Sequence, residues 1–164
     1  MNYQDRDFSG HVLSPESFRD CTLYNSKLVG ADVTYCDFSL ADARHCDFTN
    51  ANARYTRFTG ADLRFANFKG ADIRYAGFNG ADLRDAEFLG ANLNWQSHDL
   101  LAAILRKHAT TFDRLCVAGY IKLMTGHCWD HFLSLKHPEK AWALGVLKQY
   151  ALLDPAAPDI FGYL

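Results

Sequence analysis

Large apolar residues recur at every fifth position through the first part of the chain. The spacing runs from Phe8 to Leu93 without an insertion. From Ala31 to Ala91 the residue two places before each apolar one is small, most often alanine. Side chains two apart in an extended chain point the same way. Each group of five, here called a pentad, is therefore predicted to place a small and a large residue inside, two polar residues outside, and one residue at a corner.

The pentads ADLRF, ADIRY and ADLRD state this pattern almost without deviation. The pattern resembles that of the pentapeptide repeat family, and the resemblance covers about residues 6–95. It implies a mainly β fold, a right-handed quadrilateral β-helix with four pentads in each coil of twenty residues. The eighteen pentads from Phe8 to Leu93 would then make about 4.5 coils, and residues twenty apart would lie above one another.

This layout also predicts the core. Phenylalanines form two opposite internal columns, while Leu, Val, Ile and Ala fill the other two sides, so that bulky and slimmer sides alternate. Glycines at several corners suit the sharp bends. The residues expected at the centre of the core are Phe38, Phe48, Phe58, Phe68, Phe78, Phe88, Leu63 and Leu83.

Four aromatic residues at corner positions are also twenty apart, namely Tyr35, Tyr55, Tyr75 and Trp95. We expect them to stack as one column along a corner of the coil. Such a column could bind sugar rings, bases or a partner protein. It could instead only stabilise adjacent coils or seat the C-terminal segment.

Charged residues alternate in a regular way on the two slimmer sides. Asp42, Asp62 and Asp82 line one side, with Arg44, Arg64 and Arg84 two residues on, and Asp32 and Asp72 with Arg54 and Arg74 form similar columns on the opposite side. Some members of the resembled family are DNA mimics that bind type II topoisomerases such as gyrase. A DNA-mimicking modulator of gyrase is therefore one alternative, although the arginine columns interrupt any acidic stripe.

After Trp95 the pentads stop and a helical period begins, which divides the chain into residues 1–96 and 97–164. Helices are expected over residues 97–109, 111–126, 127–135 and 137–153, with Ser97 and Thr111 as N-caps, Gly126 as a stop and Pro138 in a first turn. An open β-helix end needs a cap. This α-helical module is larger than a cap requires, so we expect it also to bind a protein partner or to form a homodimer.

His127, Cys128 and His131 are candidate metal ligands, because two histidines four apart lie on one helical face and a thiolate is close by. Trp129 and Phe132 fit an ordinary core at the same place. The chain has no nucleophile elbow, phosphate loop or paired-acid signature. A metal-binding or enzymatic helical module is therefore only a second alternative, and neither a catalytic residue nor a cofactor is expected.

The composition changes this picture little. The 164 residues carry 17 Lys and Arg against 19 Asp and Glu, so no bulk charge favours direct binding of nucleic acid or of an anionic membrane. No basic and apolar leader and no membrane-length apolar run is visible, and we expect a cytoplasmic protein. The sequence therefore predicts a non-enzymatic interaction or scaffold protein with a macromolecular partner of unknown identity.

Overall fold

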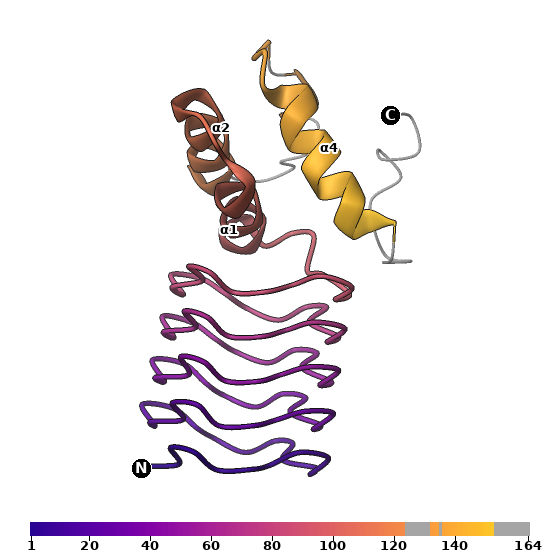
Figure 1. Cartoon of the computed structure of the whole chain (residues 1–164). Helices are drawn as coiled ribbons and strands as arrows, with labels where there is room; N and C mark the ends of the chain where they lie inside the picture. Colours follow the sequence, from indigo (N-terminus) through magenta and orange to yellow (C-terminus); the bar gives the residue numbers. More distant parts are fainter. Residues whose placement is uncertain (124–131, 135, 153–164) are drawn as a thin grey trace.

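A computed structural model describes residues 1–123, 132–134 and 136–152 of the chain. It consists of a stack of coils with a group of helices over its last coil (Figure 1). The helices whose bounds lie within the described residues are α1 (His98–His108), α2 (Phe112–Leu123) and α4 (Lys140–Ala151). The N-terminus lies at the end of the stack farthest from the helices (Figure 1).

The coils are joined by parallel bridges between residues exactly one coil apart, from Asn2 with Thr22 to Asp72 with Asn92. Backbone hydrogen bonds follow the same step, so that the Leu23 amide donates to the Asp42 carbonyl at 2.7 Å. A coil of four pentads, expected from the family resemblance, is thus the observed unit.

The coiled part begins one pentad earlier than the sequence pattern predicts. Asn2 already forms a bridge, and Tyr3 occupies an inward position against the rings of Phe8 and Phe18, with centroids 5.9 and 5.6 Å away. The apolar pattern missed this pentad because Tyr3, with its hydroxyl, is a poor match to the Phe and Leu of the later pentads.

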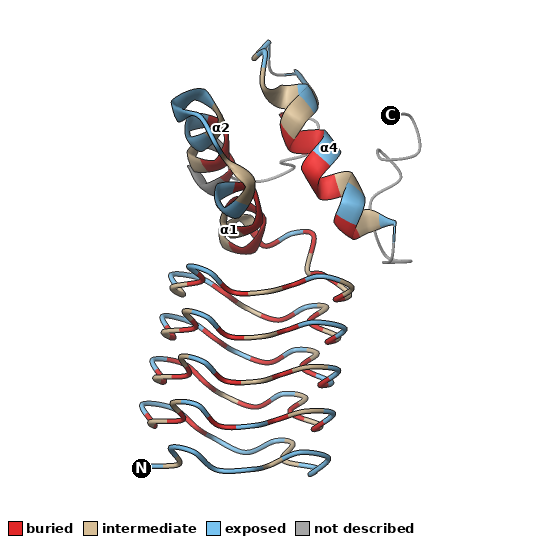
Figure 2. Cartoon of the chain, viewed as in Figure 1, coloured by how far each residue is buried: buried red, intermediate tan, exposed pale blue. Residues whose placement is uncertain are grey.

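The interior is filled as predicted. The phenylalanines stack within each column, with centroid distances of 4.7 Å between Phe48 and Phe68 and 5.3 Å between Phe38 and Phe58, and the two columns meet edge to face. Figure 2 shows buried positions lining the inside of the coils above the first. None of the predicted core residues is more than 5% exposed, and they are Phe38, Phe48, Phe58, Phe68, Phe78, Phe88, Leu63 and Leu83.

Small polar residues at the inward positions are satisfied by the coil below. The Thr56 hydroxyl donates to the Val33 carbonyl at 2.7 Å, and the Cys46 thiol lies 2.9 Å from the Leu23 carbonyl. Burial raises the pKa of the Cys46 thiol to about 12 and that of Cys36 to about 11. These thiols therefore stay protonated and fill space as small core residues.

The fifth residue of most pentads adopts a left-handed conformation, which makes the corner. Gly60, for example, has a φ of +67°, and a Cβ there would lie 2.8 Å from Cδ2 of Leu40 in the coil below. Residues other than glycine take the same conformation, among them Asn25 and Asn50 with φ of 57°. The corner geometry is therefore imposed by the coil and is not reserved for glycine.

The helices begin close to the predicted caps. The Ser97 hydroxyl accepts from the Leu100 amide, and the Thr111 hydroxyl accepts from the Arg114 amide at 3.3 Å. Helix α4 begins at Lys140. Pro138, expected in its first turn, precedes the helix, because Pro138 and Glu139 form a separate turn before it. Gly126 and most of the expected helix 127–135 lie outside the described residues. None of the described helices is long and apolar enough to cross a membrane.

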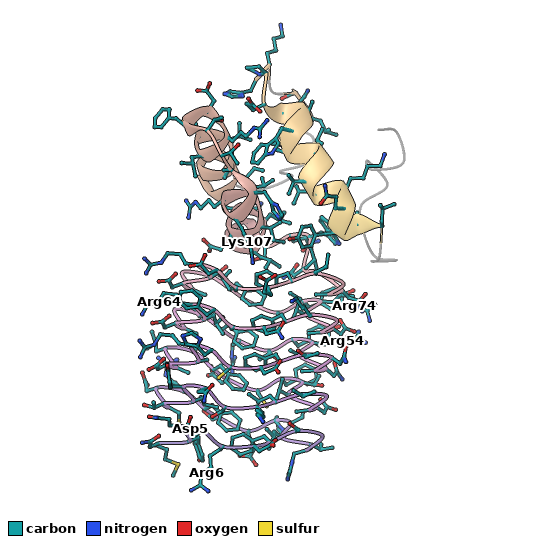
Figure 3. All side chains as sticks on the ribbon, viewed as in Figure 1. Asp5, Arg6, Arg54, Arg64, Arg74 and Lys107 are labelled. Atoms are coloured by element: carbon teal, nitrogen blue, oxygen red, sulfur yellow. The ribbon has the colours of Figure 1, made fainter. Side chains whose placement is uncertain are left out.

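Helix α1 is seated on the last coil by polar contacts at both of its ends. The Asp99 carboxylate accepts from the Gly80 amide at 3.2 Å. Lys107 reaches down from α1 to the Ala86 carbonyl at 3.3 Å and pairs with Glu87 (Figure 3). His108 and Tyr150, 3.1 Å apart, then join α1 to α4. The helical module is thus packed on the stack and covers its upper end.

Candidate functional site

Three tyrosines stack along one corner of the coil, as the sequence predicts. The rings of Tyr35 and Tyr55 are 4.9 Å apart and those of Tyr55 and Tyr75 are 4.8 Å apart, with interplanar angles of 5° and 8°. Their exposed fractions are 58%, 39% and 59%. We call Tyr35, Tyr55 and Tyr75 the tyrosine ladder; it is a flat aromatic edge that faces solvent.

Trp95 does not extend this exposed edge, so the fourth member of the predicted surface is wrong. Its side chain is only 6% exposed. The last turn lies one residue later than in the coils below: the Ser97 amide donates to the Asn94 carbonyl, whereas the Ala91 amide donates to that of Phe88. One extra residue after Leu93 shifts Trp95 off the corner, where the chain leaves the stack for α1.

The ladder tyrosines occupy a backbone conformation that tyrosine disfavours. Their φ values are 58°, 58° and 62°, and a side chain with a Cβ costs about 1–2 kcal/mol there. Each stacked aromatic pair returns about 0.5–1.5 kcal/mol. Because asparagine already serves other corners of this coil, the fold itself does not require tyrosine at these positions.

A second and shorter aromatic edge lies on another corner. His45 and Phe65 stack with centroids 4.9 Å apart, and Tyr24 meets His45 edge to face at 5.4 Å. His45 and Phe65 are also twenty apart and have φ of 58° and 61°. The twenty-residue spacing of His45 and Phe65 is the sequence signal for this edge, which the predicted aromatic column does not include.

Arginine and aspartate form a repeated contact on the slimmer sides of the coil. The Arg44 guanidinium donates to both carboxylate oxygens of Asp42 at 2.8 Å, and it lies 3.6 Å from Asp62 in the next coil. We call this bidentate contact, between an arginine and the aspartate two residues earlier, an arginine clamp. The hydrogen bonds from Arg44 lower the pKa of Asp42. The other clamps are Asp62–Arg64, Asp72–Arg74 and Asp82–Arg84.

Arg54 departs from the clamp pattern, because the residue two places earlier is Asn52. The guanidinium carbon of Arg54 instead lies 5.7 Å from the ring centroid of Tyr55 and 6.0 Å from that of Tyr75. Its Nε is buried and has no hydrogen-bond partner within the part of the chain that the structure describes. The expected pairing of Arg54 with an aspartate is therefore wrong, whereas that of Arg74 is confirmed; both side chains lie at the same edge of the stack (Figure 3).

The remaining candidates add little. His127, Cys128 and His131 lie outside the described residues, and the described part of the chain contains no cluster of three His, Cys, Asp or Glu side chains suited to a metal. A hollow of about 510 Å³ lies between the last coil and α1, lined in part by Asp82, Arg84 and Lys107. These three groups already pair with neighbouring charges.

Comparison with known proteins agrees with the repeated coil. Residues 2–78 match the model of the family described as a pentapeptide repeat region. Similar solved structures include a pentapeptide repeat protein from the Arabidopsis thaliana thylakoid lumen, with 28% identity, coverage of 62% of this chain and 74% of that chain, and a TM-score of 0.26. Full-length QnrB1, a plasmid-mediated fluoroquinolone resistance protein, is 22% identical over 56% of this chain and 62% of its own, with a TM-score of 0.33.

The pentapeptide repeat protein Rfr23 from the cyanobacterium Cyanothece 51142 is 17% identical over 55% of this chain and 86% of its own, with a TM-score of 0.26. A search of curated proteins found no match to the chain.

Proposed function

Because residues 2–78 form a pentapeptide repeat region, we propose that the chain is a non-enzymatic interaction protein that binds a protein partner at the tyrosine ladder. One observation carries this proposal. Three solvent-facing tyrosines stack along one corner in a conformation that disfavours them, whereas other corners of the coil carry asparagine or glycine. Strained residues of this kind are often retained for function.

The ladder is also suited to binding because it is held rigidly. The amides of Tyr35 and Tyr55 donate to the carbonyls of Arg54 and Arg74 in the next coil, at 3.1 and 3.2 Å. Tyrosine offers a large amphipathic contact area with few rotatable bonds. A partner that docks on a preordered surface therefore loses little conformational entropy in the protein.

The helical module supports a second contact within the same proposal. Phe112 and Leu115 are 78% and 47% exposed at the start of α2, and Cys116 beside them is exposed as well. Their spacing places them on one face of the helix. We propose this face as the part of residues 97–164 that meets a partner or a second copy of the chain.

The charge pattern weighs against the alternative of a DNA mimic. Asp42, Asp62 and Asp82 are each clamped by an arginine two residues later, so this column presents paired charges instead of a continuous acidic stripe. Positions 1–96 carry 10 basic residues beside 13 acidic ones, so their net charge is only −3. The proposed partner is accordingly one that an aromatic edge with mixed charge can recognise.

The ladder can be tested with a variant that keeps the corner geometry. We expect the triple variant Tyr35→Asn, Tyr55→Asn and Tyr75→Asn to fold, because Asn25 and Asn50 already occupy corners at the same φ. Its capture of the native partner from cells of the source organism should fall by more than about tenfold, since the aromatic contacts are lost. Quantitative mass spectrometry of the captured proteins measures this.

The matched control is the double variant His45→Asn and Phe65→Asn, which removes the other aromatic edge from equivalent corners. It should capture the partner as well as the unmodified chain does. If both variants capture as much partner as the unmodified chain does, the ladder is not the binding surface. The same holds if both lose capture of the partner equally while circular dichroism shows that both are folded.

A further inference from the structure

We propose that the ladder site recognises a carboxylate, so that the partner segment lying on Tyr55 and Tyr75 presents an Asp or Glu side chain to Arg54. The inference rests on the proposed function and names the chemistry of the partner. It comes from the difference between Arg54 and the clamped arginines, and from the position of Arg54 between the ladder and the face beside it.

The clamps show what an arginine on this face does when an aspartate stands two residues before it. Arg74, one coil above Arg54, donates from Nε to Asp72 at 2.9 Å and also pairs with it through Nη2. Arg54 has Asn52 at the equivalent position and forms no ion pair with the described residues. Its guanidinium N–H groups therefore lack the carboxylate acceptor that the aspartate provides in every clamp. Guanidinium and carboxylate groups match in bidentate geometry.

The surroundings of Arg54 prepare it for an incoming acid. Its guanidinium carbon is held 5.7 and 6.0 Å from two tyrosine centroids, beside rings that stack on each other, and a guanidinium has five N–H donors, which these rings do not satisfy as a carboxylate would. The side chain is half-buried and therefore still reachable from solvent. A buried Nε without an acceptor is unfavourable, and a nearby carboxylate would offset that cost through its charge.

The neighbouring charges favour one carboxylate over a chain of phosphates. Asp72 lies on the same face; burial opposes its charged form, but hydrogen bonds from Arg74 and the positive charge of Arg54 lower its pKa. Asp32 lies on this face as well, one coil below Arg54, where it accepts from the Thr34 amide. A nucleic acid backbone would meet these carboxylates, whereas a single acidic side chain flanked by apolar groups would fit beside the rings.

The test supplies the missing acid from within the chain. Asn52→Asp places a carboxylate two residues before Arg54 and should convert Arg54 into a clamp. The probe is a fluorescein-labelled peptide of alternating glutamate and tyrosine, compared with one of alternating glutamine and tyrosine by fluorescence anisotropy. The unmodified protein should prefer the glutamate peptide, and Asn52→Asp and Arg54→Gln should each weaken its binding by about tenfold.

Asn2→Asp is the matched control, because it adds the same charge far from the ladder. Asn2 accepts from the Gln4 amide at 2.9 Å through Oδ1, and an aspartate keeps that acceptor. This variant should bind the glutamate peptide like the unmodified protein. Thermal unfolding followed by circular dichroism confirms that each variant is folded, and Arg54→Gln provides a second test that does not depend on the new clamp.

Three results would overturn the inference. They are equal binding of the glutamate and glutamine peptides, unchanged binding by both folded variants at Asn52 and Arg54, or tighter binding of a single-stranded oligodeoxynucleotide than of the glutamate peptide. Failure here is distinct from failure of the proposed function. If the triple tyrosine variant loses the native partner while Asn52→Asp retains it, the ladder is the binding surface and the carboxylate inference is wrong.

Discussion

Phe58 and Arg57 are neighbours in the chain but lie on opposite sides of the coil wall. Phe58 is fully buried, and its ring stacks between those of Phe38 and Phe78 at 5.3 and 5.1 Å. The Arg57 side chain is 66% exposed, and its guanidinium lies 3.6 Å from Asp37. A single step along the backbone thus separates a tightly packed position from a solvated one.

We expect Phe58→Ala to lower the free energy of unfolding by about 3–5 kcal/mol, because it removes a ring from the middle of an internal column and leaves a cavity. Arg57→Ala should change it by no more than about 0.5 kcal/mol, as is usual for exposed positions. Denaturant unfolding measured side by side for the two variants checks this. Losses of similar size would contradict the assignment of inside and outside.

At this scale the pattern of apolar residues was sufficient for the core but not for every surface residue. Period-five spacing identified each buried phenylalanine of the coils, since one inserted residue would have disrupted the frame. The same spacing misplaced Trp95, because the slip after Leu93 has no signature in the apolar pattern. The sequence does contain the signal for Arg54, because Asn52 stands where the clamps have aspartate.

Within one side of a coil, the aspartate of an arginine clamp binds both the backbone and the side chain of the arginine. It therefore stabilises the corner as well as the ion pair. Asp42 accepts from the Arg44 amide at 3.4 Å and from the Arg44 guanidinium at 2.8 Å. The Asp47 carboxylate likewise accepts from the Thr49 amide at 3.0 Å. An aspartate at the second position of a pentad thus satisfies a backbone donor next to the bend.

These contacts predict how stability depends on pH. Hydrogen bonds from Arg44 and Arg84 lower the pKa of Asp42 and Asp82 in the folded state below the value of 3.8 expected without them. Their stabilisation is therefore complete above the unfolded pKa and is lost as pH falls through the lower folded pKa. We expect the melting temperature to fall on acidification below about pH 4.

The double variant Asp42→Asn and Asp82→Asn should show a shallower fall, because two of the titrating groups are gone. Melting followed by circular dichroism across this pH range gives both curves. Asn2→Asp, which leaves both clamps intact, is the control and should retain the steeper dependence. Parallel curves for the unmodified protein and the double variant would show that the clamps do not carry the acid sensitivity.

The whole molecule has two unlike ends. Residues of the first coil are largely exposed, whereas Leu93 and Trp95 in the last coil are 1% and 6% exposed beneath the helices (Figure 2). Sequence periodicity predicted that a helical module follows the coil. It could not show how α1 is seated, because the contacts of Lys107 with Ala86 and of Asp99 with Gly80 join residues that no repeat relates.

Removal of residues 97–164 should expose Leu83, Phe88, Leu93 and Trp95 together and leave the last backbone edge uncovered, so we expect aggregation. Sedimentation velocity of the purified truncated chain measures this. Deletion of residues 1–20 is the control, because it removes one whole coil, leaves the helices in place and should give a soluble protein. A monodisperse, folded truncated chain would show that the helices are not needed as a cap.

The number of residues in one side and in one coil determines how an insertion would change the shape of the molecule. Bridges join residues twenty apart. A duplication of twenty residues would therefore add one coil and leave the rotational position of every coil above it unchanged. The tyrosine ladder would become one residue longer. A duplication of five would turn the part above it by a quarter, which would carry Tyr75 away from Tyr55 and the helices to a different side. It would also place phenylalanine sides over slimmer sides and so interrupt both internal columns. The number of residues between two positions of the coil, divided by twenty, therefore determines their relation. The remainder sets the side of the coil on which the second position lies, and the whole number sets its height along the stack.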